Sequence, residues 1–147
     1  MRLHLYLRKG KVIIPTSGAV HQRLHRDIEP VAVADVSDAE GIRQAIHATI
    51  ARGNPPTPYY KPGIHPQPVV VKYAGVRSWS AFARGTSTWD INKRDANYRI
   101  VGRSLGRDGW VEDPNKTIDF PPGTSVDTVI DRMIAILQDA TRRPQGD

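Results

Sequence analysis

The sequence contains no cysteine. Disulfides, thiolate metal sites, iron–sulfur clusters and thiol nucleophiles are therefore excluded together. No run approaches the roughly 18 apolar residues that a transmembrane helix requires, and polar residues interrupt the leucines at the start, unlike the apolar segment of a signal peptide. We therefore expect a soluble protein without a signal peptide or a membrane partner, and a cytoplasmic location.

Recognisable catalytic and cofactor motifs are also lacking. The stretch Gly102–Gly106 has neither the lysine nor the strand-to-helix context of a phosphate-binding loop, and no Gly-x-Ser-x-Gly elbow occurs. His21 and His25 have the spacing of two zinc ligands on a helix, but no glutamate lies between them and the helical pattern is poor. We predict no catalytic residue, no metal site and no cofactor.

The length of 147 residues fits one domain, which we place over residues 1–147. Residues 54–68 hold six of the twelve prolines. Because proline has no amide donor, this segment is predicted to be a stiff surface loop that connects two parts of the same core. Residues 143–147 are expected to fray.

The amino-terminal part predicts a hairpin. Leucines at positions 3, 5 and 7 alternate with polar residues, as in a strand with one buried face. A Lys9-Gly10 turn leads to a second strand at 11–14. Residues 16–30 lack periodicity and are predicted to be a loop, and a third strand follows at 31–36.

Two segments have the apolar spacing of helices. The first, at about 38–52, follows a predicted capping box in which Ser37 and Glu40 exchange hydrogen bonds, and it ends at Gly53. The second, at about 125–142, carries an apolar stripe that is expected to be part of the core.

The mid-chain is expected to contain the central strand. Three consecutive valines at 69–71 suggest a strand buried on both faces, over 69–73. Gly75 would end it, and Ser78 would cap a short helical turn. Trp79 and Phe82 then share one face of this turn and are predicted to cover the core.

A second hairpin is predicted from strands at 86–91 and 98–103. Trp89 and Ile91 would face inward, so Arg99 and Arg103 would face the other side. Residues 105–116 are predicted to be a loop or an irregular hairpin, and 117–120 a last short strand. The resulting fold class is α+β: a mixed or mainly antiparallel sheet with both long helices packed on one face, in the order β-β-β-α-β-(short helix)-β-β-β-α.

The positive charge of the chain is concentrated in the middle. The formal net charge is +6, and residues 61–110 hold nine lysines and arginines against three acidic residues. A polarised basic surface indicates an acidic partner. The residues of the predicted binding surface are Arg77, Trp79, Arg84, Lys93, Arg94, Arg99, Arg103 and Arg107.

Three classes of function remain open. The leading interpretation is a small non-catalytic binding protein of an accessory, inhibitor or immunity type, which uses the basic face to bind another protein with an acidic surface. The second is binding of RNA or single-stranded nucleic acid, because arginines lie near tryptophans in the sequence. The third is a small metal-independent enzyme such as a ribonuclease, with candidates His4, His65, Lys72 and Arg77.

Overall fold

The computed structural model describes residues 1–21, 24–64 and 66–142 and has an α+β fold. All six strands form one antiparallel sheet in the order β3-β2-β1-β4-β5-β6, which confirms the predicted fold class. The elements in chain order are β1 (Arg2–Arg8), β2 (Lys11–His21), β3 (Leu24–Asp35), α1 (Ala39–Arg52), α2 (Val70–Tyr73), α3 (Trp79–Ala83), β4 (Thr86–Arg94), β5 (Asn97–Gly106), β6 (Gly109–Asp119) and α4 (Val126–Arg142).

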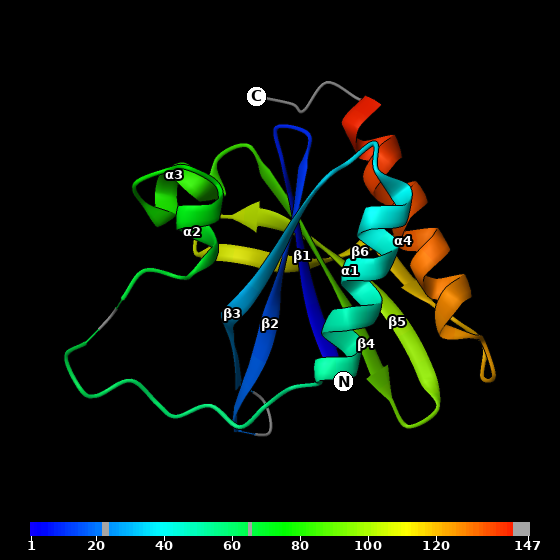
Figure 1. Ribbon diagram of the computed structural model, residues 1–147, viewed down its shortest axis with the longest axis horizontal. Helices are drawn as coiled ribbons and strands as arrows, with labels where there is room; N and C mark the ends of the chain where they lie inside the picture. The colour runs from blue at the N-terminus through cyan, green and yellow to red at the C-terminus, as the bar shows by residue number, and fades with distance from the viewer. Residues whose placement is uncertain (22–23, 65, 143–147) are drawn as a thin grey trace.

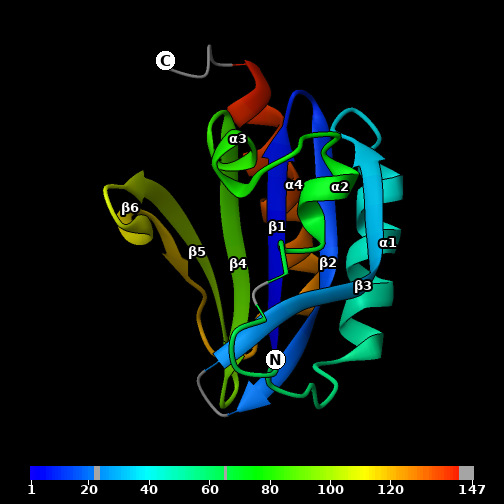
Figure 2. The ribbon, with the colours of Figure 1, turned by 90° about the vertical axis from the view of Figure 1, so that its left-hand side faces the viewer.

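The helices lie on opposite sides of the sheet. The long helices α1 and α4 cover one face, and the short helices α2 and α3 lie over the other (Figures 1 and 2). The predicted positions of the two long helices are therefore confirmed. No helix of the described residues is long and apolar enough to cross a membrane.

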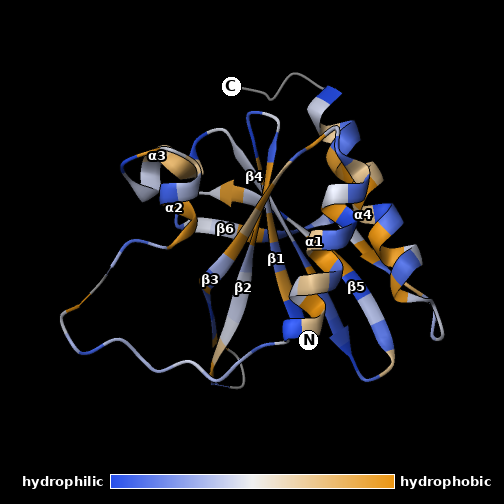
Figure 3. Ribbon diagram, in the orientation of Figure 1, coloured by the Kyte–Doolittle hydropathy of each residue, from blue (hydrophilic) through white to orange (hydrophobic). Residues whose placement is uncertain are grey.

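The main core lies between the sheet and the two long helices. Leu3, Leu5 and Leu7 of β1 pack there against the apolar stripes of α1 and α4. In Figure 3 hydrophobic and hydrophilic residues alternate along both helices. Trp89 and Ile91 face this core, as their alternation predicts. Burial of apolar surface, at about 25 cal/mol per Å², is the main stabilising contribution of this layer.

A smaller core lies under α2 and α3 on the other face. Val70 and Val71 pack there with Tyr6, Ile13 and Phe82. The predicted central strand at 69–73 is therefore wrong, because these valines form one turn of helix that Gly75 ends with a positive φ of 71°. Strand propensity mainly reflects packing on a pleated surface. Here both valines instead bury their side chains in the smaller core from a helical turn.

The predicted loop at 16–30 is also wrong. Residues 16–30 mostly extend β2 and β3, whose register shifts at Pro15/Thr16 and at Ala19/His21. The irregular hairpin, one of the two alternatives predicted for residues 105–116, is confirmed, because these residues contain the β5–β6 turn and most of β6. Irregular pairing hides the alternation that marks a regular strand, because each bulge moves the following side chains to the other face.

The predicted N-terminal caps of the helices are confirmed in part. Asp38, not Ser37, caps α1, since its side chain accepts a hydrogen bond from the amide of Gly41. Ser37 instead donates its hydroxyl to Asp35, so the predicted capping box is wrong. Ser78 caps α3 as predicted.

The described part of the proline-rich segment has no helix or strand. It is held to the end of β2 by two backbone hydrogen bonds, from Ala19 to the carbonyl of Pro55 and from Thr57 to the carbonyl of Ala19. The segment at 143–147, which was expected to fray, lies outside the described residues.

Candidate functional site

The face of the sheet opposite α1 and α4 carries rows of polar side chains. Strand pairing places Arg2 opposite Asn92, and Asn92 opposite Arg99. In the next row His4 lies opposite Asp90. We call this surface, which continues to Arg103 on β5, the polar face.

A buried network crosses the polar face at His4. Its Nδ1 lies 2.6 Å from Oδ1 of Asp27, and its Nε2 lies 3.4 Å from Oδ1 of Asp90. The hydroxyl of Tyr6 donates to Oδ2 of Asp27 over 2.5 Å. The three strands β3, β1 and β4 are therefore joined by polar contacts as well as by backbone pairing.

Asp27 reaches His4 although β2 lies between β3 and β1 in the sheet. Figure 2 shows why: the first half of β3 crosses over the face of the sheet instead of continuing in its plane. The register shift at Pro15/Thr16 marks the place where the pairing of β2 and β3 becomes irregular. Bulges increase local twist and bend strands in this way.

The carboxylate neighbours dominate the protonation of this network. Burial lowers the pKa of His4, but the hydrogen bond and the charge of Asp27, helped by the charge of Asp90, outweigh it, and the pKa is raised above the ordinary value. Burial, together with the charge of Asp27, raises the pKa of Tyr6 well above its usual range. His4 is therefore favoured as a cation between two acids.

The network does not resemble a poised catalytic base. A general base needs a ring nitrogen that can reach a substrate proton, whereas each nitrogen of His4 faces a carboxylate. Among the other candidates for a ribonuclease-type site, Lys72 pairs with Glu29 at 2.8 Å and Arg77 is exposed. His65 lies outside the described residues.

An aromatic cluster lies at the other end of the polar face. Tyr6 and Phe82 meet edge to face at 5.3 Å between ring centroids, and Trp110 of β6 contacts both rings. Trp79 of α3 closes the cluster, with its ring 5.2 Å from that of Trp110, and keeps 37% of its surface exposed. The tryptophan is thus held by the core and still presents a face to the outside.

Five of the predicted basic residues fall into two groups. In the first group, Arg99 pairs with Glu112 and Asp119, and Arg103 pairs with Asp90. In the second group, Arg77, Arg84 and Arg107 are exposed, and among the described residues their guanidinium groups have no ion pair.

The second group lies on the segments that carry Trp79 and its neighbour Trp110. Arg77 precedes the cap of α3, and Arg84 follows its last turn. Arg107 lies in the β5–β6 turn, next to Leu105, which is half-exposed and pairs with Trp110. We call this set the Trp79 surface; its residues are Arg77, Trp79, Arg84, Leu105 and Arg107.

The remaining predicted residues, Lys93 and Arg94, lie at the opposite end of β4. Lys93 lies 5.0 Å from the centre of the Tyr98 ring. Arg94 lines a hollow of about 370 Å³ together with Asn92 and Arg99. The structure thus separates the predicted surface into a Trp79 end, an Arg94 end and a paired middle.

Metal binding finds no support in the described residues. They contain no group of three or more histidines and carboxylates placed to hold an ion. His21 contacts the ring of Tyr59, at 6.0 Å, and His25 lies near the positive charges of Arg2 and His4. After burial, these charges are the main reason why the pKa of His25 is lowered.

Sequence reasoning missed Asp27, Tyr6 and Asp90 as partners of His4. The alternation of β1 places His4 and Tyr6 on the face away from the leucines, which was a usable signal. The position of Asp27 depends on the path of β3 across the sheet, for which the sequence gives no local signal.

Comparison with known proteins gives a fold and no function. No family model matches the chain, and no curated protein matches it. Among solved structures, the chain is similar to a protein of unknown function, NMB0488, from Neisseria meningitidis. The TM-score is 0.65 at 11% sequence identity, over 95% of this chain and 93% of that chain.

Proposed function

We propose that the chain is a non-catalytic binding protein of an accessory, inhibitor or immunity type, which docks on the acidic surface of another protein. The observation that carries this proposal is the Trp79 surface: a half-exposed tryptophan on α3 lies between Arg77 and Arg84 in the chain, and Arg107 lies in the turn of the hairpin that carries Trp110. These three arginines are exposed and have no ion pair among the described residues. A cytoplasmic location is part of the proposal.

The composition of the Trp79 surface suits a protein interface. Tryptophan and arginine are the residue types most enriched among those that dominate binding energy. The ring of Trp79 is supported from below by Phe82 and Trp110, at 5.3 and 5.2 Å, so docking would cost it little conformational freedom. The free arginines would speed the encounter with an acidic partner.

The distribution of charge favours a protein over a nucleic acid. A nucleic-acid strand needs a positive path that follows its backbone. In the middle of the polar face, however, Asp90 neutralises Arg103, and Glu112 and Asp119 neutralise Arg99. The unpaired arginines of the Trp79 surface form a local patch, which matches a local acidic patch.

The irregular edges of the sheet also favour docking through side chains over docking by an added strand. Edge strands bind a partner strand only where their backbone is regular and free. β6 has Pro114 and a register shift opposite Gly102, and β3 has Pro30 and two register shifts. Both edges are therefore poor templates for an added strand.

A capture experiment tests the proposal. The immobilised protein is incubated with lysate of the source organism, of which one half has been treated with nuclease. The triple variant Arg77→Glu/Arg84→Glu/Arg107→Glu is tested in parallel. The control is Arg132→Glu, on the opposite face. We expect one protein to be retained in both halves by the wild type and the control, and lost by the triple variant. Retention of nucleic acid that disappears at moderate salt would replace the proposal with the nucleic-acid alternative.

A further inference from the structure

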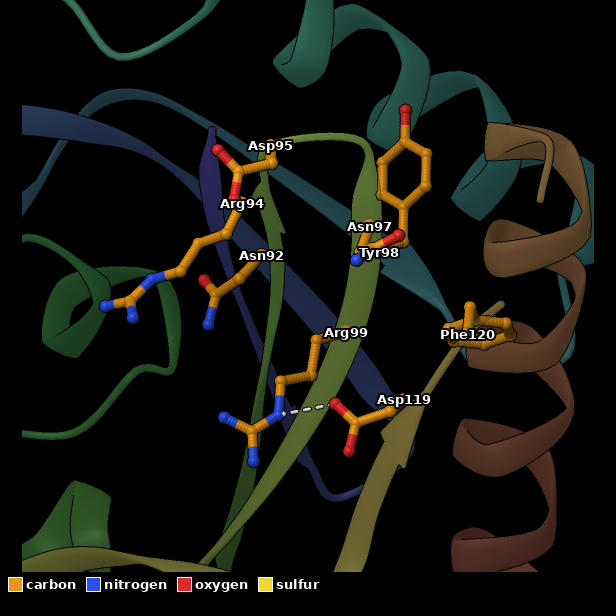
Figure 4. Close-up of a pocket in the computed structure, with 8 residues that line it drawn as sticks. All are labelled: Asn92, Arg94, Asp95, Asn97, Tyr98, Arg99, Asp119 and Phe120. Carbon is orange, nitrogen blue, oxygen red and sulfur yellow. Dashed lines mark ion pairs between the residues drawn. The ribbon is translucent and has the colours of Figure 1, made fainter. Parts of the chain in front are cut away.

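The hollow at the Arg94 end of the polar face is lined by polar side chains together with the rings of Tyr98 and Phe120. It has a volume of about 370 Å³ and lies where the ends of β4, β5 and β6 meet. Figure 4 shows the side chains of Arg94, Arg99 and Asp119 on one side of β5, whereas Tyr98 and Phe120 extend toward the helices. We call this hollow the Asn92 depression; its residues are Asn92, Arg94, Asp95, Asn97, Tyr98, Arg99, Asp119 and Phe120.

Three guanidinium groups come from positions around Asn92. Arg2 and Arg99 are its cross-strand neighbours on the two sides, and Arg94 is the next residue of β4 on the same face. Each of the three could contribute donors to an anion that lies over Asn92. The amide of Asn92 can contribute a further donor after a half-turn, which exchanges its oxygen and nitrogen.

Two of these guanidinium groups already have acidic partners: Nη2 of Arg2 lies 3.5 Å from Oδ2 of Asp90, and Arg99 pairs with two carboxylates. Arg99 is oriented by Asp119 at 2.9 Å and by Glu112 at 3.0 Å. Arg94 is exposed and has no ion pair among the described residues. Nε of Arg2 and Oδ1 of Asn92 are both buried and have no hydrogen-bond partner among the residues that the structure describes. Buried polar atoms of this kind usually have a partner, from the protein, water or a ligand.

The acidic residues of the depression favour a singly charged anion over a doubly charged one. Asp119 is neutralised by Arg99, whereas Asp95, in the β4–β5 turn, has no ion pair among the described residues. Its negative charge opposes a phosphate dianion more strongly than a carboxylate, which carries a single charge. Arginine donors in a planar fork match the geometry of a carboxylate.

We propose that the Asn92 depression binds the carboxylate of a glutamate or aspartate side chain of the partner protein. The identity of the partner rests on the proposed function, but carboxylate binding by the depression does not. The depression would give the interface a second, directional contact at the end of the polar face opposite Trp79.

Titration of the ¹⁵N-labelled protein with N-acetylglutamate methylamide tests the carboxylate site. Its neutral analogue, N-acetylglutamine methylamide, and inorganic phosphate are the comparison ligands. We expect saturable changes of the backbone amide signals of residues 92–99 with the glutamate compound, and much smaller changes with the other two. Arg94→Ala should weaken this binding by about fivefold or more, whereas Arg84→Ala, in the Trp79 surface, should leave it unchanged.

Several results would overturn the inference: equal changes with the glutamine compound, stronger binding of phosphate, equal binding by Arg94→Ala, or changes spread over all exposed arginines. The two proposals fail separately. If the wild type captures a protein partner but the glutamate compound does not bind, the carboxylate site is wrong and the proposed function stands. If the compound binds but no protein is captured, the proposed function is wrong and the carboxylate site stands.

Discussion

Asp90 keeps only 2% of its side chain exposed and accepts two hydrogen bonds from Arg103 on the neighbouring strand, at 2.9 Å from Nε and 2.6 Å from Nη2. Both donors reach the same oxygen, Oδ2, and the other oxygen faces His4 at 3.4 Å. Arg103 therefore acts first as the counter-ion of a buried acid and only second as part of an exposed basic face.

Removal of Arg103 should strongly destabilise the fold. Arg103→Met leaves the buried charge of Asp90 without its main partner, so we expect a loss of about 3–5 kcal/mol in the free energy of unfolding. The double variant Asp90→Asn/Arg103→Met should lose less than the sum of the two single variants. Urea denaturation of the four proteins measures this coupling, and additive losses would show that the pair contributes no interaction.

The His4 network should make stability depend on pH. Folding raises the pKa of His4 above its ordinary value of 6.5, so the protonated form stabilises the folded state. This contribution is complete below 6.5 and is lost as the pH rises through the raised folded-state pKa. His4→Gln should remove this part of the pH dependence in urea denaturation.

The exposed pair of His47 and Asp127 on the helical side provides the control for this prediction. Exposed pairs contribute little, so His47→Gln should keep the pH profile of the wild type. The titration of His25, whose pKa is lowered by burial and then by the charges of Arg2 and His4, is the same in His47→Gln as in the wild type, whereas His4→Gln removes the contribution of His4 to it. Identical profiles for His4→Gln and the wild type would contradict the assignment.

Gly102 allows the close approach of β6. A Cβ atom at this position would lie 2.3 Å from Cβ and 2.8 Å from the carbonyl oxygen of Lys116, so the backbone must move. We expect Gly102→Ala to cost about 1–3 kcal/mol by overpacking. At Gly106 the nearest atom would be 3.4 Å away, so Gly106→Ala should be nearly neutral. Thermal unfolding of the two variants and the wild type measures the difference.

Trp79 and Phe82 should differ in what they contribute. Phe82 is fully buried in the smaller core, so Phe82→Ala should cost about 3–5 kcal/mol. Trp79 is exposed on one side, and Trp79→Ala should cost about 1–2 kcal/mol, mainly from its contacts with other rings. Equal losses in urea denaturation would indicate that Trp79 serves the core alone.

The sequence was most informative where a pattern is local and regular. The apolar stripes of α1 and α4 and the alternation in β1 and β4 predicted those elements correctly, because each depends on neighbours in the chain. The valines at 69–71 were misread because a short apolar run is compatible with either a strand or a helical turn. Their packing with Tyr6, Ile13 and Phe82 in the smaller core decides between the two.

The site was less predictable than the fold. The alternation of β5 placed Arg99 and Arg103 on the correct side of the sheet. Their acidic partners are separated from them by 13 to 20 positions and lie on the two neighbouring strands, β4 and β6, so charge counting could not find them. The contact between His4 and Asp27 similarly depends on how β3 bends, which only the assembled sheet determines.

The most direct test of the docking surface compares Arg84→Glu with Arg132→Glu. Both arginines are exposed without an ion pair among the described residues, but Arg84 belongs to the Trp79 surface and Arg132 lies on α4. Calorimetry with the purified captured partner should give a dissociation constant at least about tenfold higher for Arg84→Glu, equivalent to 1.4 kcal/mol, and unchanged for Arg132→Glu. Equal dissociation constants for the two variants would contradict docking through this surface.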